Sequence, residues 1–313
     1  MQALSSARYR HVTFADAMDL SGRPINLAPP PNVSLQVVDQ SAASSSGTIE
    51  LCAEERSLLN WLFARVRLDA NDYRAETLAR RLPACLRLLR AASASHARAL
   101  LERNPSLVLP AVNALVIGVT SFFRDADVFR TIAQIVLPRI TEKSCTDGHV
   151  ARVWSAACSD GPELYSVAML LAEQRQLHRC HLLGTDCRLE ATQRASVGRF
   201  PAASAERDIR PALLATYFTM DEEGYYVARP CLRALLHWRT ADVLHVQEPG
   251  PWDLILCRNM AMYLRGEATQ RLWTALESSL RPGGYLVLGK AERPQGAGGL
   301  VPVAPCVYRR ERR

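Results

Sequence analysis

Long apolar runs are missing from this sequence. No stretch approaches the roughly 18 to 20 apolar residues that a membrane-spanning helix needs, and the first residues lack the apolar core of a signal peptide. We therefore expect a cytoplasmic protein without membrane insertion. The 313 residues, 48% of them hydrophobic, still suffice for a well-buried core, and the length predicts one large domain plus a smaller one.

Paired cysteines are also missing. The nine cysteines are an odd number, lie scattered through hydrophobic segments and form no C-x-x-C pair. This pattern indicates neither a disulfide framework nor a zinc site, so we expect no metal. A reducing compartment suits such a chain best.

Charge of one sign is only mildly in excess. The formal net charge is +7, and part of it comes from the basic end of the chain, residues 308–313. No aromatic platform accompanies that end, which favours a solvated tail over a nucleic-acid contact. We expect no nucleic-acid partner, while the basic balance suits an acidic partner surface.

The first third of the chain divides into two parts. Residues 1–48 are rich in proline, serine and alanine and cannot bury enough apolar surface to offset the entropy of ordering, so a mobile leader is expected. From Glu54 to Leu101 apolar residues recur at helical spacing, with interruptions at residues 71–72 and at Pro83. This pattern predicts a small helical domain over residues 49–115.

Short β-rich runs alternate with amphipathic helical runs after Gly148. Strands are predicted at residues 150–154, 181–185, 254–257 and 285–288, and helices at 163–174, 190–197 and 266–280. Such alternation predicts an α/β domain over residues 116–313 with a mainly parallel sheet covered on both faces. The stretch 200–244 breaks the alternation and is interpreted as an inserted subdomain.

The first turn between strand and helix lacks the G-x-G-x-x-G fingerprint of dinucleotide-binding proteins. Its small residues at 155–161 still allow a ligand close to the backbone, and Pro162 suits the first position of a helix. Glu163 offers a carboxylate to an ammonium group, which favours an amino-acid-like ligand over a dinucleotide. An ordinary surface acid in a first helical turn is the alternative.

Asp186 ends the second predicted strand, 25 positions after Gly161. Acids at this place in nucleotide-binding α/β domains accept hydrogen bonds from ribose hydroxyls. An aspartate that caps the following helix is an equally good explanation of the residue alone.

Polar groups also follow the strand at 254–257. Asn259, Met260 and Tyr263 stand where side chains face the crevice at the carboxyl end of a parallel sheet. Tyr263 could equally be a half-buried core residue. Upstream, Arg124 follows two phenylalanines and offers a rigid fork for a carboxylate, although an arginine in an isolated F-F-R is usually a surface charge.

Together these segments resemble the chemoreceptor glutamate O-methyltransferases, the CheR-type family, from about Glu54 to Tyr308. The resemblance implies a Rossmann-like class I S-adenosylmethionine-dependent methyltransferase domain with a small inserted β-subdomain, preceded by a small all-helical domain. The matching residues occur in the same order along this chain: 120–124, 154–156, Gly161, Glu163, Tyr165, Ser166, Asp186, 257–259, Tyr263, 282–284, Gly289 and Glu292.

The resemblance also implies a cofactor, S-adenosylmethionine, with S-adenosylhomocysteine as product. The implied cofactor-binding residues are Thr120, Arg124, Glu163, Asp186, Asp242, Val243, Asn259 and Met260. Arg124 and Tyr263 are the implied catalytic residues, nearest the sulfonium methyl. The implied acceptor is a glutamate carboxylate, which is already anionic at neutral pH with an ordinary pKa of about 4.3, so no general base is required.

Several positions depart from the family pattern. Gly118 replaces the usual asparagine two positions before the motif threonine, and Asp242 replaces an asparagine near the adenine. The first turn keeps only its second acid, and residues 290–291 replace the usual His-Ser. In the helical domain, Arg74 and the arginines at 80–81 continue the basic helix face that helps to dock receptors in the family, until the residues from Pro83 interrupt it. A solvated helix face explains these arginines equally well.

We therefore expect a methyltransferase that acts on carboxylates of a chemoreceptor or of a receptor-like cytoplasmic signalling domain. Two alternatives stay open from the sequence. The enzyme could act on a small molecule or another protein, or the chain could be a non-catalytic module that binds S-adenosylmethionine. Retention of both Arg124 and Tyr263 favours an enzyme.

Overall fold

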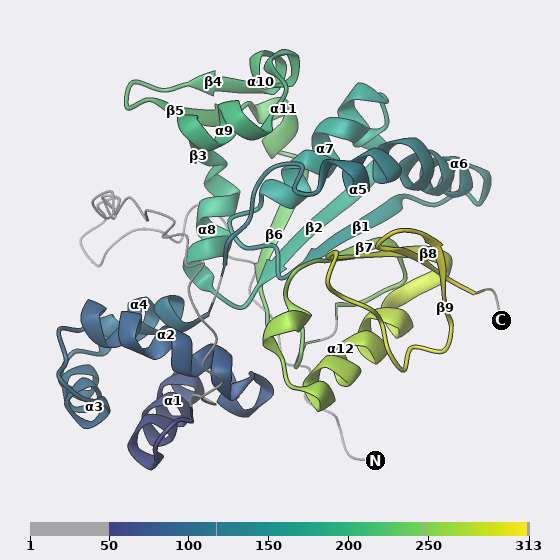
Figure 1. Cartoon of the computed structure of the whole chain (residues 1–313). Coiled ribbons are helices and arrows are strands. Elements are labelled where there is room, and N and C mark those ends of the chain that lie inside the picture. Colours follow the sequence, from purple (N-terminus) through teal and green to yellow (C-terminus); the bar gives the residue numbers. More distant parts are fainter. Residues whose placement is uncertain (1–49, 117, 247, 312–313) are drawn as a thin grey trace, which may run out of the picture. The chain divides into compact units, whose positions relative to one another are not determined.

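The computed structural model describes residues 50–311 except 117 and 247 (Figure 1). The leader predicted at residues 1–48 lies outside these described residues. Within the described part, none of the helices combines the length and the apolar character needed to cross a membrane.

Helices build the segment up to residue 115, as the apolar spacing predicted. Its elements are α1 (Ala53–Arg65), the short 3-10 helices η2 (Ala70–Asp72) and η3 (Pro105–Leu107), α2 (Ala75–Leu88), α3 (Ala94–Arg103) and α4 (Val108–Leu115). The expected interruption at Pro83 is wrong, because α2 runs through it. The proline ring lies on the exposed side of α2, where a missing backbone donor leaves no buried group unpaired.

A seven-stranded sheet forms the centre of the second segment, in the order β6-β2-β1-β7-β8-β10-β9. Its strands are β1 (Ala151–Ala156), β2 (Cys180–Asp186), β6 (Leu236–Thr240), β7 (Trp252–Cys257), β8 (Leu280–Leu288), β9 (Leu300–Ala304) and β10 (Val307–Arg310). The first five in this order pair in parallel, and β10 and β9 add an antiparallel edge. The predicted mainly parallel α/β sheet is thus confirmed.

Helices cover both faces of this sheet. They are α5 (Ala126–Thr131), the π-helical turn η4 (Ile132–Val136), α6 (Leu137–Thr146), α7 (Pro162–Glu173), the short η5 (Leu177–Arg179), α8 (Leu189–Val197) and α12 (Gly266–Ser279). In Figure 1, α6 and α7 lie on one side of the central strands and α12 on the other. The run from α5 to α6 had no counterpart among the predicted elements.

Alternation along the strands explains how two separate cores form. In β7, Leu254 and Leu256 join the core beneath α6 and α7, while Ile255 and Cys257 join the core that contains α12. Successive side chains of a strand point to opposite faces, so a strand buried on both sides needs an apolar residue at every position. The core on the α12 side continues into helices α1, α2 and α4, so these helices pack on the second segment as one hydrophobic unit.

The predicted insertion at 200–244 contains a separate small sheet. Strands β3 (Arg199–Pro201), β5 (Tyr225–Ala228) and β4 (Phe218–Met220) pair antiparallel in that order. The helices of this part are α9 (Ala202–Asp208), α10 (Pro211–Tyr217) and α11 (Pro230–Arg233). By contrast, β6 lies inside the predicted range but pairs in parallel with β2 in the large sheet.

The strand predicted at residues 285–288 starts earlier in the structure, because residues 282–284 precede it without a break. These residues belong to β8, which shows a register shift against β7, and Gly283 there has a φ of +84°. A glycine tolerates this conformation where other residues are strained, so the strand bends without ending.

The chain order places a switch point next to β1. After β1 the chain adds β2 and then β6 on one side, and it returns to place β7 on the other side of β1. In open parallel sheets, ligands bind at the carboxyl ends of strands where the order reverses in this way. A ligand-binding site is therefore expected at the turns after β1, β2 and β7.

Candidate active site

A pocket opens at this switch point, and every residue proposed from the sequence lines it. They are Thr120, Arg124, Glu163, Asp186, Asp242, Val243, Asn259, Met260 and Tyr263. The turns after β1, β2, β6 and β7 supply most of the wall, and the segment that precedes α5 supplies the rest. Residues far apart in the sequence thus converge because parallel strands end at the same edge.

The segment before α5 is anchored on both sides of Arg124. Phe122 is buried and packs edge-on against Phe200 with ring centroids 4.7 Å apart. The backbone N–H of Phe123 donates to Ser166 Oγ in α7 at 3.0 Å. The carbonyl oxygen of Arg124 accepts from Arg258 Nη2 at 2.7 Å. Both phenylalanines thus act as anchors, as their apolar character suggested.

Arg124 itself is half-buried in the pocket wall. Its Nη1 donates to the carbonyl oxygen of Val119 at 3.1 Å, and no other described residue accepts from its guanidinium. The remaining donors are therefore available to a ligand at the pocket, which differs from a lone surface charge.

Glu163 lies in the first turn of α7 and is buried, with 8% of the residue exposed. Its Oε1 accepts from Ser155 Oγ at 2.8 Å, and its Oε2 accepts from Arg258 Nη1 at 3.2 Å. The alternative of an ordinary surface acid is thus wrong. An ionised carboxylate has further lone pairs, so Glu163 can still accept from a ligand cation.

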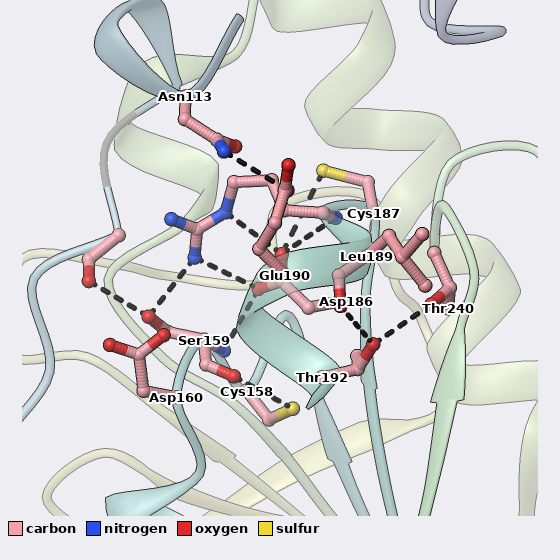
Figure 2. Close-up of polar contacts among 12 residues, drawn as sticks. Asn113, Cys158, Ser159, Asp160, Asp186, Cys187, Leu189, Glu190, Thr192 and Thr240 are labelled. Atoms are coloured by element: carbon pink, nitrogen blue, oxygen red, sulfur yellow. Dashed lines mark hydrogen bonds and ion pairs between the residues drawn. The ribbon is translucent and has the colours of Figure 1, made fainter. Parts of the chain in front are cut away.

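Asp186 ends β2 and is buried beside the turn after β1 (Figure 2). Its Oδ2 accepts the backbone N–H of Ser159 at 2.8 Å, and its Oδ1 accepts the backbone N–H of Arg188 at 3.0 Å. The second bond closes a local turn ahead of α8, whose N-cap residue is Arg188, so Asp186 does not cap this helix. The carboxylate also pairs with the Arg188 side chain, with Nε 3.0 Å from Oδ1.

A buried carboxylate shapes the loop after β7. Glu292 Oε2 accepts the backbone N–H groups of Asn259 and Gly289, and its Oε1 accepts that of Ala261, each at 2.8 Å. Asn259 has a φ of +57°, an uncommon conformation outside glycine. Three charge-assisted hydrogen bonds thus hold a strained backbone so that the Asn259 side chain faces the pocket.

The turn after β6 contributes Asp242 and Val243. Asp242 Oδ1 accepts the backbone N–H of Leu244 at 3.0 Å, and Oδ2 lies 2.7 Å from His245 Nδ1. Val243 is buried and offers an apolar surface. Together they give the pocket a carboxylate beside an apolar patch.

Three titratable groups of the wall remain neutral. Burial raises the pKa of the Cys158 and Cys187 thiols, and the carboxylate of Asp186 adds to the shift in both. Burial also raises the pKa of the Tyr73 phenol well above its ordinary value, and the nearby carboxylate of Asp242 adds to the shift. Neither thiol therefore supplies a thiolate nucleophile near neutral pH.

Part of the pocket wall was not predicted from the sequence. Tyr73, Thr77 and Leu115 come from the helical segment, and nothing in their local pattern distinguished them from core residues. For Arg258 the sequence did hold a signal, because an arginine directly after an apolar strand is buried and needs a carboxylate to compensate its charge. The structure gives it two carboxylates, Glu163 and Asp125, with its side chain only 2% exposed.

Comparison with known proteins decides the family. The model of the CheR methyltransferase SAM-binding domain matches residues 118–305, which is more than half of the chain. The chain belongs to the CheR methyltransferase family. S-adenosylmethionine is therefore its cofactor, and methyl transfer is its class of reaction, as the sequence motifs indicated.

CheR-family relatives are similar over much of their length. Chemotaxis protein methyltransferase 1 of Pseudomonas aeruginosa is 30% identical over 188 residues, covering 58% of this chain and 68% of the relative. The chemotaxis protein methyltransferase of Listeria monocytogenes is 31% identical over 193 residues, covering 62% and 72%. The solved glycopeptide N-methyltransferase MtfA is 12% identical with a TM-score of 0.30, covering 51% and 59%, and adds nothing to the assignment.

The pocket of this CheR-family chain suits the cofactor chemically. Asn259 Oδ1 is buried at the pocket and accepts no hydrogen bond from any described residue. A buried acceptor without a donor is costly, so a ligand with a donor such as an ammonium group satisfies it. Glu163 and Asp186 add carboxylates for a cationic group and for hydroxyls, and Arg124 adds donors for a carboxylate.

Proposed function

We propose that this CheR-family methyltransferase transfers a methyl group to glutamate side-chain carboxylates of a chemoreceptor or a receptor-like signalling protein. The convergence of Arg124 and Tyr263 on the pocket that holds Glu163, Asp186 and Asn259 carries the proposal. The names of the relatives, chemotaxis protein methyltransferases, support the choice of substrate.

Within the pocket, we assign the residues to different parts of the cofactor. Asp186 would accept from the ribose hydroxyls. Glu163 and Asn259 would hold the ammonium end, because both offer buried oxygen acceptors. Asp242 and Val243 would contact the adenine, and Thr120 and Met260 would complete the wall.

When bound, the cofactor would supply a methyl group on a positively charged sulfur, which would leave as a neutral thioether when a carboxylate oxygen took the methyl group. No residue of this chain has to remove a proton, because a glutamate side chain is anionic at neutral pH. The task left to the protein is to hold the acceptor in line with the methyl group. The free donors of Arg124 suit a carboxylate at this position, and the half-buried Tyr263 lies in the same wall as a second donor.

The docking of the acceptor is the part of the family pattern that changes most. Arg74 is exposed, but its Nε donates to the carbonyl oxygen of Leu264 at 2.8 Å and so ties the helical segment to the catalytic one. Arg80 is exposed, while Arg81 is partly buried. Of the three arginines of this face, Arg80 is thus the one best placed to meet an acidic receptor helix.

The acceptor can be tested by transfer of labelled methyl from S-adenosylmethionine. Purified cytoplasmic fragments of the host's receptors and an extract of its small metabolites would be offered in parallel to the full chain. We expect base-labile label on a receptor fragment, lost when the accepting glutamates are changed to alanine. Label confined to small molecules, or cofactor binding without any transfer, would contradict the proposed substrate. A reaction on receptor cytoplasmic segments would also place this protein in the cytoplasm.

A further inference from the structure

The carboxylate of Asp186 is saturated by donors from this chain. Oδ1 accepts from the backbone N–H and from Nε of Arg188, each at 3.0 Å, and Oδ2 accepts from Ser159 N at 2.8 Å and Arg188 Nη2 at 3.4 Å. Figure 2 shows Asp186 and Ser159 side by side with these hydrogen bonds. Both members of the ion pair are buried, with 5% of Asp186 and 9% of Arg188 exposed.

The donors are of two kinds. The N–H groups of Ser159 and Arg188 belong to the backbone of the turns after β1 and β2, so they stay in place while the fold stays intact. The guanidinium of Arg188 belongs to a side chain, so its position is not fixed by the backbone of these turns. An ionised carboxylate has about four acceptor positions, so the positions held by the guanidinium are those that a ligand could use.

The guanidinium lies inside the pocket wall. Its Nη2 also donates to Ser159 Oγ at 3.0 Å, and Ser159 Oγ donates to the carbonyl oxygen of Gly118 at 2.8 Å. A Cβ added at Gly118 would lie 2.1 Å from Arg188 Nη1, so the absence of a side chain there makes room for the guanidinium. Gly118, Ser159, Asp186 and Arg188 all line the pocket.

We propose that Arg188 is an internal competitor of the cofactor ribose, which holds the ligand-accessible acceptor positions of Asp186 until the ribose hydroxyls displace it. A vicinal diol offers two donors, which matches the two side-chain donors of Arg188. Arg188 is then a residue that sets cofactor affinity and selects for an intact ribose. The inference rests on the proposed function, in which Asp186 receives the ribose.

The physical logic is an exchange of partners. Without a ligand, a buried Asp186 carboxylate would be costly unless a cation compensated it, and Arg188 provides the charge. The hydroxyls of a ribose provide hydrogen bonds but no charge, so the displacement of Arg188 subtracts from the free energy of cofactor binding. Removal of the guanidinium should therefore tighten the binding of diol ligands alone.

The test compares the wild-type chain with Arg188→Ala. Calorimetric titration with S-adenosylhomocysteine should show the dissociation constant falling by about tenfold in the variant, the size of one charge-assisted hydrogen bond that no longer has to be broken. The dissociation constant of 2′,3′-dideoxyadenosine, measured by ligand-observed NMR, should not change. Adenosine, which keeps the diol, should gain affinity as S-adenosylhomocysteine does.

Two further variants make the result decisive. Arg188→Met keeps the length of the side chain without its donors and should behave like the alanine variant. Arg194→Ala serves as the matched control, because Arg194 lies in α8, the helix whose start Arg188 caps, and pairs with Asp160 at the exposed surface. It should leave the affinity for S-adenosylhomocysteine as in the wild type.

Weaker or unchanged binding of S-adenosylhomocysteine by folded Arg188 variants would overturn the proposal. An equal gain for 2′,3′-dideoxyadenosine would overturn it too, because the effect would not depend on the diol. If neither variant folds, Arg188 is a fixed part of the structure and not a displaceable group. These outcomes are distinct from failure of the proposed function, which would show as no binding by the wild type or no methyl transfer to receptors.

Discussion

The surroundings of Arg124 in the fold determine what its side chain can bind. In sequence it is a cation after two phenylalanines, yet in the fold it is half-buried in the pocket and leaves most of its donors to a ligand. Its backbone is held by Arg258 from the loop after β7, which itself binds Glu163. Arg124 and Glu163 are thus held by one and the same buried guanidinium.

We expect Arg124→Ala to lower kcat for methyl transfer by at least about a hundredfold, since positioning of reacting groups contributes several kcal/mol to a barrier. Binding of S-adenosylhomocysteine should weaken much less, because Glu163, Asp186 and Asn259 remain. Steady-state kinetics and calorimetry measure the two effects separately. Arg130→Ala, at an exposed position of α5, is the control. Comparable losses in transfer and in binding would show that Arg124 mainly holds the cofactor.

Gly118 and Arg188 are in close contact, and this contact decides which residues position 118 can hold. The backbone of Gly118 is not in the left-handed region, so glycine is needed there for space and not for conformation. A residue with a side chain at 118 therefore requires the guanidinium of Arg188 to move.

Gly118→Asn, the residue usual in the family, should thus destabilise the wild-type chain but have little effect in an Arg188→Ala background. Contacting residues show coupling energies of about 0.5 to 3 kcal/mol in double-mutant cycles, and we expect a value in that range here. Urea unfolding of the four proteins gives the cycle. Additive effects within about 0.5 kcal/mol would show that the two positions do not compete for space.

At the scale of elements, local pattern predicted the alternating strands and helices well and failed where packing overrides propensity. The strand at 181–185 and the helix at 190–197 appear within one residue of their predicted bounds, because apolar periodicity reports burial directly. Pro83 suggested an interruption that the structure does not show, and β8 runs through Gly283 and Gly284 although the predicted strand begins only at residue 285. Their neighbours are buried in the large sheet and in the helical core, and this burial outweighs a local breaker.

Helix α2 therefore carries a cost at Pro83, which lacks the N–H that would donate to Ala79. Pro83→Ala should raise the free energy of unfolding by about 1 to 2 kcal/mol, the interior cost of proline less its benefit in the unfolded chain. Urea unfolding measures the change, with Arg80→Ala, another exposed position of α2, as control. A less stable alanine variant would mean that the proline ring itself makes a favourable contact.

At the scale of the whole molecule, one continuous core joins the helical segment to α12 and one face of the large sheet. Backbone bonds reinforce it, since Arg74 N donates to Tyr263 O at 2.9 Å and Arg265 N donates to Asp72 O at 2.8 Å. The helical segment also supplies Tyr73 to the pocket. The pocket and this hydrophobic core are thus built by both segments together.

Alkaline pH should weaken this shared core. Burial raises the pKa of the Cys85 thiol in α2 from its ordinary value of 9.0 to about 11. Below pH 9.0 the thiol is protonated in both the folded and the unfolded states, and above it only the unfolded state ionises, so stability falls as the pH rises toward 11. The free energy lost through this one group approaches about 3 kcal/mol.

The measurement is urea unfolding of the wild type and of Cys85→Ala between about pH 7.5 and pH 11, a range that spans the ordinary and the raised pKa of the Cys85 thiol. The stability advantage of the wild type over the variant should shrink as the pH rises. A difference that stays constant over this range would show that the thiol ionises equally in both states.

The amino-acid sequence by itself determined the class of fold, the alternation of strands and helices after Gly148, and the residues at the ends of β2 and β7. These follow from apolar periodicity and from the rule that parallel strands end at one edge, both of which are visible in local sequence. Only the tertiary structure decided which groups meet there. Glu292 holds the backbone of Asn259 across 33 positions, Tyr73 enters the wall from the helical segment, and the Arg188 guanidinium fits on Asp186 because Gly118 leaves room. Such contacts depend on packing between distant elements, which no local pattern encodes.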